Sequence, residues 1–469
     1  MKNHKIKFTT LFLLVILCLQ TTMLFSQQSS WKTNQDGWVL RKKSGDTKYE
    51  RFFAIGLWNV PGYQPNAMEK GADDYRESAK PYLDKSPLYN MVYMSPGDLK
   101  FQKERVEITG SIGFYEMLKK YTDNIPNIKP DNDSDYAKRQ YMKKHVNDDS
   151  FVNALDSAID LLIKQNGSTD HIYAPIDEIA NGGAGSGWCW PAVVGNKIKE
   201  RINKKEKNTL VYTDLVGMPK ANTYLFEQQY LQTHDSMPPT PPYEALGKDA
   251  VILKDRPLLG FNRAYDGSPL YINGTADYVD YDIETLKKLY FGTLKNTAAG
   301  YKGCGDVFGI NGFIDFNTYP VLAGTTVDAI KAGIGSKTPV WLFYDGNGYA
   351  KPSNMSAEDF IKIIKCQMYT SIIHGATGIL FWNDRSNTPE VFNTLEPVIK
   401  ELQETLNIVY LNTSDWKSNN DLHYMIKVKD KKHSYIIATN TSMTDTIDLN
   451  IPNVSKKSLK PLEVYVAPI

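Results

Sequence analysis

Short apolar runs alternate with amphipathic segments along most of the chain, and this alternation restricts the possible folds more than any other feature of the sequence. The amphipathic segments at 148–167, 282–301 and 356–376 carry apolar residues at helical spacing. Strands that alternate with helices are typical of a parallel sheet covered by helices. Eight such units over roughly 350 residues predict an α/β fold, the (β/α)8 TIM barrel, rather than a doubly wound sheet. The predicted strands are residues 51–60, 88–95, 139–147, 171–178, 209–216, 312–319, 339–346 and 377–384.

Two regions depart from this alternation. Residues 216–280 are too long and too rich in proline for one connector, so we expect an insertion that passes over one end of the barrel. After residue 405, apolar residues recur at every second position in 422–430, 433–441, 445–452 and 462–469. A sheet this small buries little surface alone. The sequence therefore predicts a barrel over residues 27–405 and a small antiparallel β-sandwich domain over 406–469 that packs against it.

The first 26 residues combine a basic start, an apolar run and a polar continuation. This pattern is typical of a secretory signal peptide, so we expect a secreted or periplasmic mature chain. Later apolar runs fall short of the ~20 residues that a membrane-spanning helix needs, so we expect no span in the mature chain. Of the 4 cysteines, Cys18 lies in this leader, and the others are too widely spaced for a disulfide framework or a metal-ligand cluster.

Charge and aromatic content narrow the choice of partner. The formal net charge is +1, and no extended basic field suggests a nucleic-acid partner. Aromatic residues make up 12% of the chain, with 29 Tyr and 8 Trp. Flat amphipathic side chains in such excess suit the faces of sugar rings, although a tyrosine-rich core would give the same count.

Polar residues stand at the ends of most predicted strands. In barrels, working residues come from the carboxyl ends of the strands and the loops that follow. A purely structural barrel does not need them, but Asp and Asn also cap helices, so each residue alone allows both interpretations. The residues at these ends are Asn59, Ser95, His145, Asn147, Asp177, Glu178, Asp214, Asp315, Tyr319, Tyr344, Asp345, Asn383 and Asp384.

Glu178 is the best single candidate for a catalytic residue. Asp177 and Glu178 close an apolar strand, and the chain then enters the glycine-rich loop "NGGAGSGWCW" instead of a helix. Helix capping therefore explains these two acids poorly. Because adjacent residues of a strand point to opposite sides, only one of the pair can face the barrel axis.

Four segments carry a resemblance to a known group of proteins. They are "FFAIGLWNVPGY" at 52–63, "YAPIDEIA" at 173–180, "DFNTYPV" at 315–321 and "IIHGATGILFWND" at 372–384. Together they resemble the clan of glycoside hydrolases built on (β/α)8 barrels, over residues 45–400. The resemblance implies that Glu178, at the end of the fourth strand, is the general acid/base, and that the substrate is an oligosaccharide.

The chain departs from this clan at the seventh strand. The clan has a second glutamate there, whereas this chain has Tyr344 and Asp345. Asp345 is expected as the nucleophile if its carboxyl lies about 5–5.5 Å from the acid, or as an inverting base at a wider spacing. A site with tyrosines and His145 could instead abstract a proton and expel a leaving group, as a lyase or dehydratase does. Arg263 or Lys302 would then have to lower the pKa of a tyrosine.

Aromatic residues at or just beyond strand ends are candidates for stacking on sugar rings. Two aromatic residues within strands, Trp341 and Phe381, are expected to belong to the core. His374 is expected to be structural, and we predict neither a metal site nor a cofactor. The candidate stacking residues are Trp58, Tyr63, Trp188, Trp190, Tyr319, Tyr344 and Trp382.

These observations predict a secreted, glycoside hydrolase-like enzyme that cleaves oligosaccharides from a complex polysaccharide. Glu178 and Asp345 would be catalytic, and the polar strand-end residues would orient the sugar, with no nucleic-acid partner. One alternative is a polysaccharide lyase or oligosaccharide dehydratase that uses the same cleft. A second is a glycan-binding protein on a decayed hydrolase scaffold. The residues expected to orient the sugar are Asn59, His145, Asp177, Asp214, Asp315 and Tyr319.

Overall fold

The computed structural model describes a large part of the chain, and the statements below concern that part. The described residues are 29–58, 88–93, 106–109, 141–166, 170–176, 179, 191–216, 287, 291–292, 294–295, 298–311, 320–346, 351, 355–382, 389–451 and 457–469.

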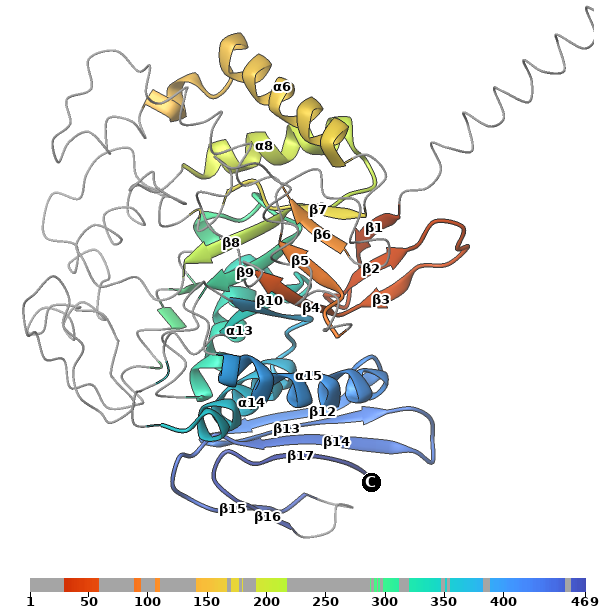
Figure 1. The fold of residues 1–469 in the computed structure, drawn as a ribbon, viewed down its shortest axis with the longest axis vertical. Helices are drawn as coiled ribbons and strands as arrows, with labels where there is room; N and C mark the ends of the chain where they lie inside the picture. The colour runs from red at the N-terminus through yellow and green to blue at the C-terminus, as the bar shows by residue number, and fades with distance from the viewer. Residues whose placement is uncertain are drawn as a thin grey trace, which may run out of the picture.

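Eight parallel strands form the central sheet, in the order β7-β6-β5-β4-β11-β10-β9-β8 (Figure 1). Their ladders are parallel throughout, and one parallel bridge between Tyr173 and Val211 links the two outermost strands, β7 and β8. The sheet is therefore barrel-like, as expected for the α/β class. The strands are β4 (Ala54–Trp58), β5 (Met91–Tyr93), β6 (Val106–Thr109), β7 (His171–Tyr173), β8 (Tyr212–Val216), β9 (Val307–Asn311), β10 (Val340–Asp345) and β11 (Gly378–Trp382).

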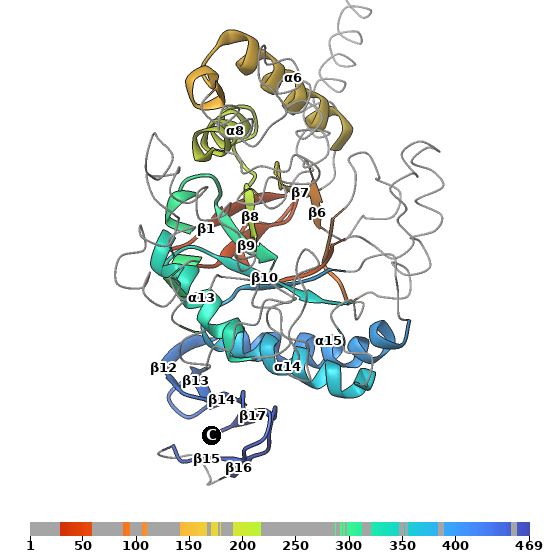
Figure 2. The ribbon, with the colours of Figure 1, turned by 90° about the vertical axis from the view of Figure 1, so that its left-hand side faces the viewer.

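Helices flank the sheet on two sides. In Figure 2, α6 and α8 lie on one side of it, and α13, α14 and α15 lie on the other. The start of α14 follows from its sequence, because the Ser356 hydroxyl accepts a hydrogen bond from the Asp359 amide at 3.1 Å. Gly375, with φ +94°, follows its end. The helices are α6 (Asp149–Asn166), α8 (Ala192–Lys205), α13 (Val321–Ile334), α14 (Ala357–Ile373) and α15 (Pro389–Val409).

A three-stranded antiparallel sheet precedes the barrel-like sheet and covers its amino end. It consists of β1 (Ser30–Thr33), β2 (Val39–Lys42) and β3 (Glu50–Phe52). Trp31, Val39 and Phe52 from these strands pack in one apolar cluster with side chains from inside the parallel sheet. The amino end of the sheet is therefore closed by packed side chains.

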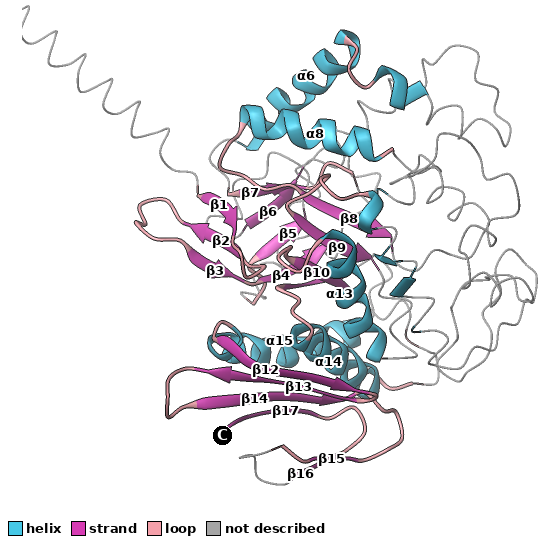
Figure 3. Ribbon diagram, turned by 180° about the vertical axis from the view of Figure 1, so that it is seen from behind, coloured by secondary structure: helices cyan, strands magenta, loops and turns pink. Residues whose placement is uncertain are grey.

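The C-terminal part is antiparallel, as the period-two pattern predicts. A four-stranded sheet contains β12 (Asn412–Asn419), β13 (Leu422–Val428), β14 (Ser434–Asn440) and β17 (Val464–Pro468), and a ribbon contains β15 (Ile447–Leu449) and β16 (Lys457–Leu459). Figure 3 shows α14 and α15 between this sheet and the parallel sheet. Within the described residues, no helix combines the length and apolar character that crossing a membrane requires.

The third predicted strand is wrong. Residues 141–145 are helical, and the third strand of the sheet is β6, which the sequence analysis did not predict. The sixth strand, β9, ends at Asn311, whereas the segment predicted for it, 312–319, lies outside the described residues. The other six predicted strands contain the observed β4, β5, β7, β8, β10 and β11. The leader also lies outside the described part, as does the predicted insertion at 216–280 apart from Val216.

Candidate active site

Among the described side chains of the parallel sheet, neighbouring residues of a strand divide between two apolar clusters on opposite faces. In β10, Trp341 and Phe343 belong to the inner cluster, which contains side chains from β1, β4, β7 and β8. Leu342 and Tyr344 belong to the outer cluster, which also contains side chains from the helices. Because side chains alternate along a strand, Asp345 shares the inner face with Trp341 and Phe343.

Asp345 therefore stands on the inner face at the carboxyl end of the sheet. It is the last residue of β10, and its side chain is buried. In the ladder between β10 and β11, Asp345 is the direct partner of Trp382. Trp382 is half-buried and packs against the inner cluster. The structure thus brings together one predicted catalytic residue and one predicted stacking residue on adjacent strands.

Asp214 provides a second carboxylate on the same inner face. It is 1% exposed and accepts a hydrogen bond from the Tyr212 hydroxyl, with 3.3 Å between Tyr212 Oη and Asp214 Oδ1. Through Gly309 of β9, the register aligns Asp214 with Trp341, four residues before Asp345 on β10. Asp345 therefore lies nearer than Asp214 to the carboxyl edge of the sheet.

The sequence analysis missed Tyr212. Its ring stacks on that of Trp341, with 5.5 Å between centroids and 23° between planes. The segment "VYTDLV" places Tyr212 two residues before Asp214, hence on the same side of β8. That spacing was the available signal.

Tyr344 does not line the inner face, so its predicted role as a substrate contact is wrong. Its hydroxyl lies 2.8 Å from Ser371 Oγ and donates to the Gln367 carbonyl at 3.2 Å, both on α14. Burial raises the pKa of Tyr344 far above its usual value, and the hydrogen bond to Ser371 only partly offsets this. Tyr344 is a core residue between sheet and helix.

His145 is not at a strand end, contrary to the prediction. It lies in the helical turn before α6, where its ring stacks on Tyr141 at 4.1 Å. Its Nδ1 is 2.6 Å from Asp148 Oδ2. These local contacts explain the residue without a ligand.

Several predicted site residues lie outside the described part of the chain, so their roles stay predictions. This holds for the side chain of Trp58, whose backbone ends β4. The others outside the described part are Asn59, Tyr63, Ser95, Asp177, Glu178, Trp188, Trp190, Asp315, Tyr319, Asn383 and Asp384.

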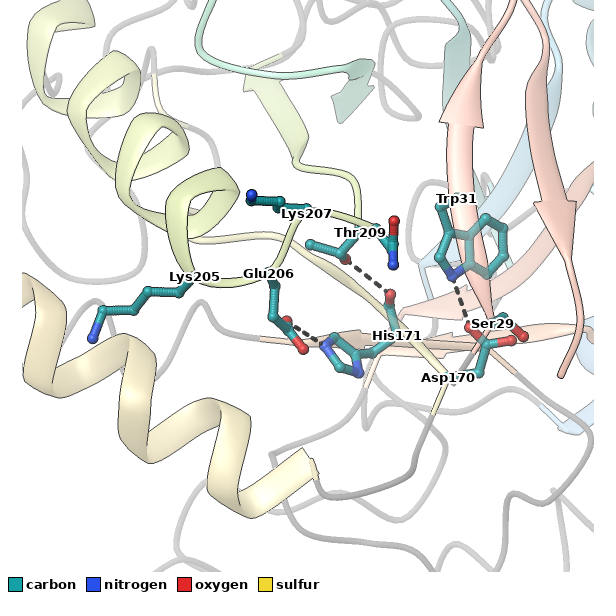
Figure 4. A pocket seen from close by; sticks show the side chains of 9 residues that line it. Ser29, Trp31, Asp170, His171, Lys205, Glu206, Lys207 and Thr209 are labelled. Atoms are coloured by element: carbon teal, nitrogen blue, oxygen red, sulfur yellow. Dashed lines mark hydrogen bonds and ion pairs between the residues drawn. The ribbon is translucent and has the colours of Figure 1, made fainter. Parts of the chain in front are cut away.

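A cavity of about 210 Å³ opens at the other end of the sheet (Figure 4). Trp31 Nε1 donates to Asp170 Oδ1 at 2.7 Å, and Arg41 forms an ion pair with Asp170. His171 Nε2 is 3.1 Å from Glu206 Oε2. Burial opposes ionisation of Glu206, but the hydrogen bond and charge of His171 prevail and lower its pKa. These charged groups are paired with one another at the amino end of the sheet. We therefore interpret the residues around the cavity as structural contacts between the first antiparallel sheet, β7 and the end of α8.

His374 is structural, as predicted. Its Nδ1 is 2.8 Å from Asp328 Oδ2, and its Nε2 is 2.9 Å from His423 Nδ1 in the C-terminal sheet. Trp341 and Phe381 are buried, also as predicted. Among the described residues, no three His, Cys, Asp or Glu side chains are grouped closely enough to hold a metal ion.

Comparisons with known proteins give matches to solved structures alone. No protein-family model and no curated protein matches the chain. An alpha-amylase from Geobacillus thermoleovorans, solved with acarbose, is 10% identical with a TM-score of 0.45, covering 89% of this chain and 99% of its own. A cyclic alpha-maltosyl-(1→6)-maltose hydrolase from Arthrobacter globiformis is 8% identical with a TM-score of 0.38, covering 89% and 99%.

An endo-beta-1,6-glucanase is 9% identical with a TM-score of 0.35, covering 93% of this chain and 92% of its own. The names of these three proteins describe enzymes that act on carbohydrates. All three TM-scores are below 0.5.

Proposed function

We propose that this protein is a glycoside hydrolase-like enzyme that cleaves oligosaccharides derived from a complex polysaccharide. The observation that carries the proposal is the pairing of Asp345 with Trp382 on the inner face at the carboxyl end of the parallel sheet. Barrel enzymes place their chemistry at this end. A carboxylate beside an indole suits a sugar, because the ring can stack on a pyranose face while the carboxylate acts on its polar edge.

We further propose that the sheet is a closed (β/α)8 barrel. The residue pairing can be followed around the sheet at constant register, starting at Val211 and passing through β9, β10, β11, β4, β5 and β6 to β7. On the line of β7 this pairing ends at residue number 165, whereas the bridge between the first and last strands pairs Val211 with Tyr173. This offset of about eight residues equals the shear of a TIM barrel. The register thus supports closure independently of the number of strands.

In this proposal, Glu178 is the general acid and Asp345 the second carboxylate. Glu178 would protonate the glycosidic oxygen while the bond from that oxygen to the anomeric carbon breaks. As that bond breaks, Asp345 would either attack the anomeric carbon, and a water deprotonated by Glu178 would then hydrolyse the glycosyl ester, or it would deprotonate a water that attacks the anomeric carbon from the opposite face. The first route needs the carboxyls about 5–5.5 Å apart and the second about 6.5–9.5 Å. Asp214, below Asp345, would orient sugar hydroxyls.

The position of Tyr344 removes one candidate base for elimination. A lyase or dehydratase without a nucleophile needs a side chain that takes a proton from the substrate. Tyr344 was a candidate, but it is buried behind the sheet and its pKa is raised. We also propose that the chain is exported with 1–26 as its leader, since polysaccharides are met outside the cell.

The test is incubation with oligosaccharide digests of neutral and acidic polysaccharides, read by mass spectrometry. The wild-type chain should release smaller sugars, and Glu178→Gln and Asp345→Asn should each be slower by about 100-fold or more. Glu404→Gln, which changes an exposed carboxylate on α15, is the matched control and should keep full activity. Binding without turnover by the wild-type chain would instead show the glycan-binding alternative.

A further inference from the structure

We infer that Tyr212 is a positioning residue for Asp214, and that Gly309 provides the space in which their contact forms. The inference rests on the proposed function, since it concerns the same inner face. It adds a supporting layer beneath the carboxylates, made by three consecutive strands of the sheet, β8, β9 and β10.

The hydrogen bond between the two side chains is the first observation. Tyr212 Oη is 3.3 Å from Asp214 Oδ1, and both side chains are almost fully buried. A buried phenol needs an acceptor for its proton, and a buried carboxylate needs donors. The bond satisfies the phenol and one oxygen of the carboxylate, and it restricts the rotation of the Asp214 side chain.

The second observation concerns the plane of the Tyr212 ring. It is stacked on Trp341, which is fully buried and lies on β10, two strands away from β8. The ring therefore extends across β9 instead of pointing straight into the interior. A ring held by a second aromatic side chain is a rigid support for its hydroxyl.

Gly309 explains how the ring can cross β9. In the register of β8 and β9, Gly309 is the direct partner of Asp214. A Cβ atom at Gly309 would lie 2.6 Å from Tyr212 Cε2 and closer still to the hydroxyl oxygen. Any other residue at this position would force the phenol out of hydrogen-bonding reach of Asp214.

The same arrangement continues around the inner face. Trp341 lies over Gly378 of β11, and Leu380 lies over Gly56 of β4, each where a Cβ atom would collide with it. A large side chain thus covers a neighbouring glycine three times in succession. This layer forms a packed floor, and Tyr212 is the member whose polar end reaches a carboxylate of the site.

The floor has a chemical consequence for Asp214. A hydrogen bond donated to a carboxylate favours its ionised form. An ionised and oriented Asp214 can accept hydrogen bonds from sugar hydroxyls in a fixed direction, which is the role proposed for it. Without the Tyr212 hydroxyl, the carboxylate would rotate more freely and take up a proton at a higher pH.

The experiment compares Tyr212→Phe with the wild-type chain on the oligosaccharide that the wild type cleaves fastest. The substitution keeps the ring and its stacking on Trp341 and removes the hydroxyl alone. We expect kcat/KM to fall about tenfold and the acidic limb of the pH–rate profile to move to higher pH. An unchanged pH profile with a lower Tm would overturn the inference, because a purely structural tyrosine gives that result.

Tyr369→Phe is the matched control. Tyr369 is a buried tyrosine on α14 whose hydroxyl lies 3.4 Å from Thr405 Oγ1, so its loss costs a similar bond far from the carboxylates. We expect this variant to keep the wild-type pH profile. An equal shift in both variants would also overturn the inference.

Asp214→Asn keeps the inference testable if Tyr212→Phe does not fold. The Asn side-chain oxygen can still accept the Tyr212 hydrogen bond, so the variant should fold, while kcat/KM should fall at least tenfold. Full activity of a folded Asp214→Asn would contradict the inference. A wild-type chain that cleaves no glycan would count against the proposed function. A wild-type chain that cleaves glycans, with kcat/KM unchanged in Tyr212→Phe and Asp214→Asn, would count against the inference about Tyr212.

Discussion

The imidazoles of His374 and His423 form a hydrogen bond, with 2.9 Å between His374 Nε2 and His423 Nδ1. His374 follows α14 and His423 lies on β13, so the bond joins the helical layer to the C-terminal sheet. Two further hydrogen bonds extend this contact. Asp328 on α13 contacts His374, and Ser418 on β12 lies with its hydroxyl 2.9 Å from His423 Nδ1. Four elements are thus tied together by polar side chains, of which the two histidines are buried.

The free energy of unfolding should depend on pH through His423. Burial, followed by the charges of His374 and Lys287, lowers the pKa of His423 to about 3. In the unfolded chain it returns to about 6.5, so between these values the unfolded state alone binds the proton. Stability is therefore lost as the pH falls through this window. Between about pH 6.5 and 4.5 the loss should be about 2 kcal/mol.

His423→Gln removes the titrating group, so urea unfolding of this variant should show a weaker decline over the same pH range. His433→Gln, which changes an exposed histidine on the hairpin after β13, is the control and should decline as the wild type does. Identical declines for all three proteins would show that His423 does not carry the effect.

Lys427→Met should stabilise the protein at neutral pH. Lys427 is 5% exposed, and its Nζ lies 3.1 Å from the Leu411 carbonyl oxygen. Burial, and then the charge of Arg51, lower the pKa of Lys427 to about 8. Removing the buried charge should raise the free energy of unfolding at pH 7 by about 1–2 kcal/mol, after allowing for the lost hydrogen bond.

This gain should shrink as the pH rises from about 8 to 10.5, because the wild-type amine is then neutral in the folded state and still protonated in the unfolded state. Urea unfolding at pH 7 and pH 10 checks both statements. A gain that grows with pH would contradict the account, as would a variant that is less stable at pH 7.

Gly378→Ala should disrupt the floor of the sheet. A Cβ atom there would lie 2.6 Å from Trp341 Cγ, so the ring must move. Overpacking of this kind costs about 1–3 kcal/mol. In a Trp341→Phe background the smaller ring should reduce this cost, and chemical denaturation of the two single variants and the double variant measures the difference. Strict additivity would show that the Trp341 contact is not the cause.

Some elements could be predicted because local pattern and final structure agree. Every residue of β10 is buried, which matches the apolar run from Val340 to Tyr344. The prediction of the third strand was wrong for a physical reason. Met142 and Val146, both buried, are four residues apart, a helical spacing within a segment interpreted as a strand. The true third strand, with the sequence VEIT, is too short and too polar to stand out.

The site divides in a similar way. Asp214 and Asp345 could be named as candidates because barrel enzymes carry their working residues toward the carboxyl ends of the strands. The sequence could not decide which of Tyr344 and Asp345 faces inward, since that depends on which face of β10 meets α14. The role of Tyr212 was hidden for the same reason. It depends on contacts with Gly309 and Trp341, which belong to other strands.

The carboxylates on the inner face are proposed to hydrolyse a glycosidic bond. Reaction of the wild-type chain with its best oligosaccharide in H₂¹⁸O, followed by mass spectrometry, tests this proposal most directly. We predict one ¹⁸O atom in the products for each bond broken, and a loss of this signal in Asp345→Asn. Products whose total mass equals that of the substrate, without ¹⁸O, would contradict hydrolysis and show elimination instead.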